Sequence, residues 1–199
     1  MSRTFIQTLS IQKDLKADLD FHSLPGTVEA GAQSSGFFIE KNGIRRILGI
    51  DPGLASTGWG IIDFKQNRYR LVKYGVVETN ADEPHGQRLM AIYSRLVAVI
   101  EEFRPDECGM ETLYFAKNAT SAMAVAEARG VVTLALAQHC VPLYEYTPNT
   151  IKQSVTGSVK ADKKLVQNYV KLILGLETVP KPDHAADALA AAITRIHYK

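Results

Sequence analysis

The sequence predicts an α/β domain with a mixed five-stranded sheet, in which an antiparallel hairpin edge joins parallel strands, flanked by helices. Short segments rich in apolar, β-branched and aromatic residues alternate with longer segments whose apolar residues recur every three or four positions, the periods of strands and helices. Three segments of the first kind come first, and a brief polar turn joins two of them. Strands joined in this way pair antiparallel, whereas strands separated by helices favour a partly parallel sheet.

The first predicted strand covers residues 47–50, an apolar run that Pro52 and Gly53 stop. A short apolar run bounded by turn residues is typical of a buried central strand, so we expect this strand to end at Asp51. The next two strands form the hairpin because the polar residues 65–68 separate them, and they are expected over residues 59–64 and 69–77.

The remaining elements alternate between helices and strands. Apolar residues from Leu89 to Phe103 repeat at three and four positions, which predicts an amphipathic helix that Pro105 stops. A short strand that carries Glu111 follows this helix. The predicted order is three strands, a helix, a strand, a helix, a strand and two helices. From residue 108 onward we expect strands over 108–113 and 141–147 with a helix over 121–139 between them, a helix start at Pro148, and helices over 163–174 and 184–196.

The long predicted helix has a face of small residues, because Ala122, Ala126 and Gly130 recur every four positions. Small residues at this spacing let another backbone approach closely. That backbone can belong to the sheet or to the equivalent helix of a second subunit, and the sequence leaves both open.

Composition indicates one ordinary folded domain in a reducing compartment. The chain has 199 residues, of which 46% are hydrophobic, and a formal net charge of +2, so composition alone does not announce a nucleic-acid partner. Cys108 and Cys140 have neither disulfide nor metal-ligand spacing, and no apolar run is long enough to span a bilayer. We therefore expect a cytoplasmic location and no membrane partner.

Residues 1–43 differ from the rest of the chain, and we expect the folded domain over residues 44–199. Ile11, Leu15 and Leu19 have helical spacing, and a stretch with turn and linker residues follows them. The segment is interpreted as a flexible or dispensable extension, with a partner-docking helix as the alternative.

Two carboxylates are expected at the ends of predicted strands. Asp51 stands at the carboxyl end of the first strand, where open α/β sheets build their sites, although Asp before Pro-Gly is also an ordinary turn residue. Glu111 lies in an apolar strand, where a carboxylate is costly to bury unless it is paired or binds a cation. If the two strands are neighbours, a divalent cation between the carboxylates would offset their repulsion.

The start of the last helix supplies further candidate ligands. His184 and Asp187 are three positions apart and share a face, and Asp183 and Asp187, which are four apart, share one as well. Asp183 can instead stabilise the helix N-terminus through the macrodipole. The neighbouring alanines would let this helix lie flat against the sheet and bring its acidic end to Asp51.

Carboxylates in this pattern suit a hard cation such as Mg²⁺, which takes oxygen ligands together with water and phosphate oxygens. Paired ions of this kind can activate water for hydrolysis. Tyr114, which closely follows Glu111, is either a core residue or an aromatic side chain that stacks on bases. The basic residues that could neutralise a phosphate backbone are Lys117, Arg129, Lys152, Lys160, Lys163 and Lys164.

Together these motifs resemble the RuvC family of bacterial Holliday junction resolvases. The resemblance covers residues 44–199 in collinear order. It implies an RNase H-like fold, a homodimer, and Mg²⁺-dependent paired nicking of four-way DNA junctions in recombination and repair. It also implies cooperation with the RuvA–RuvB branch-migration complex. The matching segments are residues 47–53, 57–60, Glu111 with 114–119, 128–130 and 185–190.

By position, the resemblance implies catalytic and metal-binding roles for Asp51, Glu111 and Asp187. The family often has an aspartate at the position of His184. We expect His184 to be a ligand or near-ligand, because imidazole binds Mn²⁺ and other transition metals, and we expect Mn²⁺ to support activity as well as Mg²⁺. The expected DNA contacts are Tyr114, Lys152 and Lys163, which match DNA-associated positions of the family, with Lys117 and Lys160.

Three other functions remain open on the sequence. An Asp-x-Gly segment followed by Thr-Gly also occurs in actin-like ATPases and sugar kinases, but those enzymes need two domains around a nucleotide. A junction-binding module could have lost cleavage through His184, and another RNase H-like nuclease could act on RNA or a different branched structure. Assays on linear, hybrid and four-way substrates would separate these functions.

Overall fold

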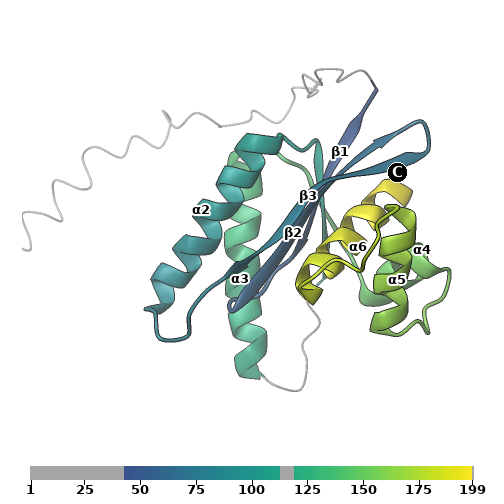
Figure 1. Ribbon diagram of the computed structural model, residues 1–199. Helices are drawn as coiled ribbons and strands as arrows, with labels where there is room; N and C mark the ends of the chain where they lie inside the picture. Colours follow the sequence, from purple (N-terminus) through teal and green to yellow (C-terminus); the bar gives the residue numbers. More distant parts are fainter. Residues whose placement is uncertain (1–42, 113–118, 199) are drawn as a thin grey trace, which may run out of the picture. The chain divides into compact units, whose positions relative to one another are not determined.

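The computed structural model describes residues 43–112 and 119–198, and the predicted mixed five-stranded sheet is confirmed (Figure 1). The strand order is β3-β2-β1-β4-β5, with β2 antiparallel to β1 and β3, and β4 parallel to β1 and β5. β1 is therefore the central strand, as the sequence predicts. The strands are β1 (Arg45–Asp51), β2 (Ser56–Lys65), β3 (Arg68–Glu78), β4 (Glu107–Glu111) and β5 (Leu143–Tyr146).

Helices cover both faces of the sheet, with α2 and α3 on one face and α4, α5 and α6 on the other (Figure 1). Three helices follow β5, so the predicted order, which ends with two, is wrong at this point. The additional helix begins at Pro148, where Thr147 caps it by accepting a hydrogen bond from the Thr150 amide. The helices are α2 (His85–Phe103), α3 (Ala119–Gln138), α4 (Pro148–Thr156), α5 (Lys163–Ile173) and α6 (Asp183–His197).

Some predicted features lie outside the described residues. They are the N-terminal extension up to residue 42 and the segment 113–118, which contains Tyr114 and Lys117. The side chains of residues 119–121 are likewise not described. Among the helices within the described ranges, none combines the length and apolar composition that crossing a membrane requires.

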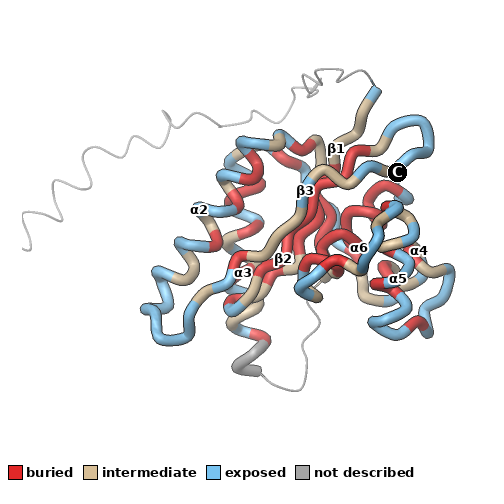
Figure 2. Tube along the Cα trace, viewed as in Figure 1, coloured by how far each residue is buried: buried red, intermediate tan, exposed pale blue. Residues whose placement is uncertain are grey.

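The sheet separates two hydrophobic cores, seen as buried (red) segments on both of its sides in Figure 2. Leu48 and Met110 pack with residues of α2 and α3 such as Leu136. Ile47 packs on the opposite face with residues of α4, α5 and α6 such as Ile193. Ile47 and Leu48 belong to different cores because successive residues of a strand face opposite sides of the sheet.

A row of glycines lets α6 lie directly on the sheet. Gly60 of β2, Gly49 of β1 and Gly109 of β4 are cross-strand neighbours. A Cβ atom at Gly49 would lie 1.9 Å from the Ala188 carbonyl oxygen, and one at Gly109 would lie 2.5 Å from the Ala191 carbonyl oxygen. The glycines of the strands and the alanines of α6 therefore bring main chain against main chain, in agreement with the expectation that this helix lies flat.

Candidate metal centre and nuclease site

Asp51 and Glu111 end neighbouring parallel strands and point to the same face of the sheet. Ile50 pairs with Met110 in the register of β1 and β4, so the residues that follow them are neighbours as well. Ile50 and Met110 belong to the core beneath α2 and α3. Alternation along the strands therefore directs Asp51 and Glu111 towards α6.

The turn after β1 is held by Thr57, which is completely buried. Its hydroxyl donates to the Gly53 carbonyl at 2.7 Å and accepts from the Gly53 amide at 3.2 Å. These bonds fix the chain just beyond Asp51, whose partner in β2 is Gly58. A Cβ atom at Gly58 would lie 2.0 Å from the His184 carbonyl oxygen, so glycine is needed for α6 to begin beside the turn.

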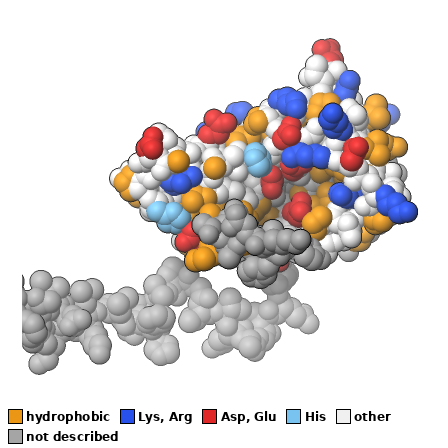
Figure 3. All heavy atoms as spheres, turned by 90° about the horizontal axis from the view of Figure 1, so that it is seen from below, with side chains coloured by type: hydrophobic (Ala, Val, Ile, Leu, Met, Phe, Trp, Pro, Cys, Tyr) orange, Lys and Arg blue, Asp and Glu red, His pale blue; other side chains and the backbone are white. Residues whose placement is uncertain are grey.

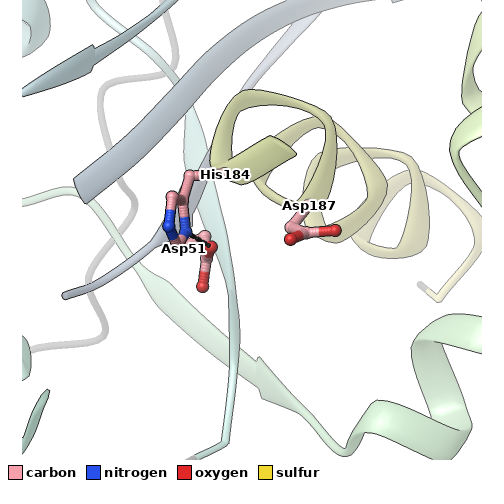
Figure 4. A group of neighbouring side chains, drawn as sticks. All are labelled: Asp51, His184 and Asp187. Atoms are coloured by element: carbon pink, nitrogen blue, oxygen red, sulfur yellow. Dashed lines mark hydrogen bonds and ion pairs between the residues drawn. The ribbon is translucent and has the colours of Figure 1, made fainter. Parts of the chain in front are cut away.

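α6 brings two further potential ligands to Asp51 (Figure 4). His184 Nδ1 lies 2.7 Å from Asp51 Oδ2, and the Asp187 carboxylate comes from the next turn of α6. Each of the three side chains offers one ligand atom, and these atoms lie within 4.8 Å of one another. Two carboxylates and an imidazole at this spacing fit a divalent cation.

Glu111 is not a member of that group of three, but its charge is coupled to theirs. Burial, together with repulsion from Asp51 and Asp187, raises the pKa of Glu111 to about 7. Burial also raises the pKa of Asp51, although its hydrogen bond with His184 works in the opposite direction. A bound cation would offset both the cost of burying charged carboxylates and the repulsion between them. The negative charge of the site therefore suits a divalent metal.

Two lysines lie beside the carboxylates. Lys163 Nζ, on α5, lies 2.9 Å from Asp187 Oδ2. Lys152 of α4 and Lys163 line a cavity of about 230 Å³ together with Glu111 and Asp187. On the face seen in Figure 3, acidic side chains (red) lie near the middle, with Lys and Arg side chains (blue) beside them. A carboxylate site flanked by cations suits a phosphodiester substrate.

Asp183 stands apart from the group of three ligands. Its carboxylate accepts a hydrogen bond from Lys181 at 2.9 Å, and this bond lowers the pKa of the exposed Asp183 carboxyl. Asp183 is the acidic residue of the first turn of α6. This position favours the interpretation that Asp183 stabilises the helix N-terminus.

The expected DNA contacts are only partly brought to the site. Lys152 and Lys163 line the cavity, whereas Lys160 lies in the connection between α4 and α5 and is not among the lining residues. Tyr114 and Lys117 lie outside the described residues. The roles assigned to these five residues, and the catalytic roles of the four candidate ligands, stay predictions.

Arg129 differs most from its sequence-based interpretation as a surface cation. Its side chain is only 15% exposed, its guanidinium donates to the Glu111 main-chain carbonyl, and it pairs with the Glu145 carboxylate. The sequence carried two signals of this role, an arginine in an alanine-rich helix and the place of Arg129 in the matching segment 128–130. The bonds of Thr57 to Gly53 were not predicted, although Thr57 lies in the matching segment 57–60, because a Thr four residues after a turn Gly has many possible partners.

Comparison with known proteins identifies the family. The family model of the crossover junction endodeoxyribonuclease RuvC matches residues 47–195. This chain belongs to the RuvC family. The crossover junction endodeoxyribonuclease RuvC of Treponema denticola is 60% identical over 154 residues, which cover 76% of this chain and 85% of that protein. The RuvC of Chloroflexus aurantiacus is 51% identical over 148 residues, covering 74% of this chain and 90% of that protein.

Solved structures agree with this assignment. Thermus thermophilus RuvC in complex with a Holliday junction substrate superposes with a TM-score of 0.75 at 37% identity, covering 77% of this chain and 94% of that chain. The yeast mitochondrial Holliday junction resolvase Ydc2 has a TM-score of 0.55 at 16% identity, over 75% of this chain and 78% of that chain. The latter similarity concerns the fold alone, and the expected RNase H-like architecture is confirmed.

Proposed function

We propose that this chain is a divalent-metal-dependent endonuclease that resolves four-way DNA junctions, in recombination and DNA repair, by paired nicking of opposed strands. One observation carries the proposal: in a chain of the RuvC family, the ligand atoms of Asp51, His184 and Asp187 lie within 4.8 Å of one another at the end of the central strand. The neighbouring lysines supply the positive charge that a phosphate backbone needs.

The metal is proposed to be Mg²⁺, with Mn²⁺ also supporting cleavage. Asp51, Glu111, His184 and Asp187 would hold it, because carboxylate oxygens suit both ions and imidazole suits Mn²⁺. When bound, divalent cations activate the attacking water and stabilise the leaving oxygen. Lys163 pairs with Asp187. If that carboxylate held a cation, the Lys163 ammonium would be available to a substrate phosphate.

The test of this function is cleavage of a labelled synthetic four-way junction with Mg²⁺ or Mn²⁺. Paired symmetric nicks that disappear in Asp51→Asn would support a junction resolvase with Asp51 at its centre. Tight junction binding without cutting in either metal would indicate a non-cleaving module. Cutting of linear or RNA–DNA hybrid substrates in preference to the junction would indicate another RNase H-like nuclease.

The proposed role of His184 has a spectroscopic test. If its imidazole binds the metal, pulsed EPR of the Mn²⁺-loaded protein will detect coupling to a ¹⁴N nucleus, and His184→Asp will abolish this coupling. The variant should still cleave with Mg²⁺, because a carboxylate is a suitable ligand for that ion. A wild-type spectrum without nitrogen coupling, or an inactive His184→Asp, contradicts direct ligation.

A homodimer formed through α3 is the proposed assembly. Ala128 and Val132 of α3 are buried against the sheet, and Ala122, the third residue of the predicted small-residue face, is buried as well. Ala126 and Gly130 are exposed on the other side. Among the described residues, a Cβ atom at Gly130 would meet nothing within 4 Å. The outer face also carries two large apolar side chains, Met123 and Leu134, which are 66% and 53% exposed. The sequence left open whether the small residues of α3 pack against the sheet or against the equivalent helix of a second subunit. This exposed apolar face favours the helix of a second subunit.

The dimer proposal predicts that Gly130→Arg yields a monomer, measured by light scattering after size-exclusion chromatography. Such a monomer should nick junction strands singly, because paired cutting needs two sites. Gly86→Arg is a matched control, since a Cβ atom at Gly86 of α2 also meets no atom of the described part of the chain within 4 Å. A Gly130→Arg protein that stays dimeric and cuts in pairs would exclude α3 as the interface.

Three further assignments rest on the family resemblance. We propose cooperation with a RuvA–RuvB complex and a cytoplasmic location. We also propose that residues 1–43 are dispensable for the nuclease, because the family model begins at residue 47. A protein lacking residues 1–43 should keep junction cleavage, and loss of cleavage with a native fold would instead give that segment a docking role.

A further inference from the structure

Arg129 contacts the strand ends of the nuclease site from the face of the sheet that α3 covers. It lies on α3, and its guanidinium contacts two strand ends at once, the main-chain carbonyl of Glu111 at the end of β4 and the carboxylate of Glu145 in β5. β4 and β5 are parallel neighbours in which Met110 pairs with Glu145. The two contacts of the guanidinium therefore tie α3 to adjacent strands at the edge where the candidate ligands gather.

The side chain of Glu111 is not part of this contact. Met110 and Cys108 face the core beneath α2 and α3, so the Glu111 side chain points to the opposite face, towards α6. Arg129 thus holds the peptide that follows Glu111 and leaves the Glu111 carboxylate free for the metal. A peptide group is planar, so fixing its carbonyl restricts the direction in which the Glu111 side chain leaves the strand.

Burying a charged guanidinium costs free energy, which its contacts must offset. Burial lowers the pKa of Arg129, and the charge of Glu111 works in the opposite direction. The planar fork of arginine can serve two acceptors in fixed directions, which the single ammonium of lysine cannot do. Metal ligands generally depend on neighbouring groups that hold them in orientation by hydrogen bonds. Removal of such a group weakens metal binding by about 10–100-fold.

We propose that Arg129 is a positioning residue that orients Glu111 for metal binding and cleavage. This inference rests on the proposed function for its cleavage readout, but Mn²⁺ binding to the protein without DNA tests it separately. If the wild-type protein fails to cut junctions while Arg129→Gln still weakens Mn²⁺ binding, the proposed function fails and the positioning role stands.

The experiment measures Mn²⁺ affinity by EPR titration, the single-turnover cleavage rate at saturating enzyme, and junction affinity without divalent metal. Arg129→Gln is expected to weaken Mn²⁺ binding and to slow cleavage, each by about 10–100-fold, with junction affinity unchanged. Arg129→Lys should be intermediate. Glu145→Gln is the matched control, because it removes the ion pair but keeps the contact between Arg129 and the Glu111 carbonyl.

A double-mutant cycle with Glu111→Gln decides whether Arg129 acts through Glu111. In the Glu111→Gln background, Arg129→Gln should weaken Mn²⁺ binding no further. An independent further loss overturns the proposal, as does wild-type Mn²⁺ affinity in Arg129→Gln. A fall in junction affinity that equals the fall in cleavage would make Arg129 a DNA contact instead.

Two further results also count against the positioning role. If Glu145→Gln reproduces every effect of Arg129→Gln, the ion pair between α3 and β5 is what matters. If Arg129→Gln does not fold, Arg129→Lys replaces it, and native thermal stability with unchanged Mn²⁺ affinity in that variant overturns the proposal.

Discussion

Replacing Glu111 by glutamine should stabilise the metal-free protein at pH 8, although it removes a candidate catalytic group. Burial and the charges of Asp51 and Asp187 raise the pKa of Glu111 to about 7, from an ordinary value of 4.5. A difference of about 2.5 units corresponds to at most about 3.4 kcal/mol. Glu111 is only half-buried, so solvent screening reduces the expected gain to about 1–2 kcal/mol.

The pH dependence of this gain has a definite sign. The folded protein binds the Glu111 proton more tightly than the unfolded chain does, so this carboxyl destabilises the fold progressively as the pH rises from about 4.5 to about 7. Below this window the carboxyl is protonated in both states and the difference between wild type and Glu111→Gln should shrink. Above the window the difference should reach its full size.

Chemical denaturation in EDTA at pH 5 and pH 8 measures the free energies of unfolding. Mg²⁺ should then stabilise the wild type at pH 8 by mass action, by about 2.7 kcal/mol at a hundredfold excess over its Kd, and stabilise Glu111→Gln less. The reasoning is refuted if Glu111→Gln is no more stable than wild type at pH 8, or if the difference is the same at both pH values.

Four other substitutions test the packing and the charges. Gly49→Ala should destabilise the fold by several kcal/mol or prevent folding, because its Cβ would lie 1.9 Å from the α6 main chain. Gly130→Ala is the control: the space around Gly130 is open among the described residues, so thermal unfolding should place this variant within about 1 kcal/mol of wild type. Lys163→Gln removes the 2.9 Å ion pair with Asp187, so Mn²⁺ affinity without DNA should rise while the salt dependence of junction binding falls by about one unit; an unchanged salt slope would contradict a phosphate contact. Leu136→Ala should lower the free energy of unfolding by about 2–5 kcal/mol and leave Mn²⁺ affinity unaltered, and a weakened metal affinity in the folded variant would show that the two cores are coupled.

Much of the fold could be predicted because its elements carry strong local periods. The apolar run before Pro52 placed the central strand and the position of Asp51 at its end, and the apolar repeat up to Phe103 placed α2. The alanines around Asp187 indicated a helix that lies flat on the sheet. These features depend on residues close together in the chain, so the sequence displays them directly.

The precise surroundings of the ligands could not be predicted, because they depend on contacts between distant segments. The 2.7 Å contact between His184 and Asp51 joins residues 133 positions apart. The burial of Arg129 depends on where the ends of β4 and β5 lie relative to α3. By contrast, the bounds of α4 and α5 have local signals that the predicted order did not use, because Gly157 ends α4 in the left-handed region and Asp162 caps α5 by accepting from the Leu165 amide.

Because of the glycine row beneath α6, substitutions on the two faces of the sheet have different consequences. Side chains fill the space between the sheet and the helices α2 and α3. Exchanges between large and small apolar residues there can change the thermal stability of the protein during evolution. On the other side, α6 rests on main chain at Gly49 and Gly109, so the spacing between His184, Asp187 and the strand ends does not depend on which apolar residues fill the opposite layer. We therefore expect apolar substitutions on the α2 and α3 side, where Arg129 is not changed, to alter thermal stability without altering the spacing of these ligands.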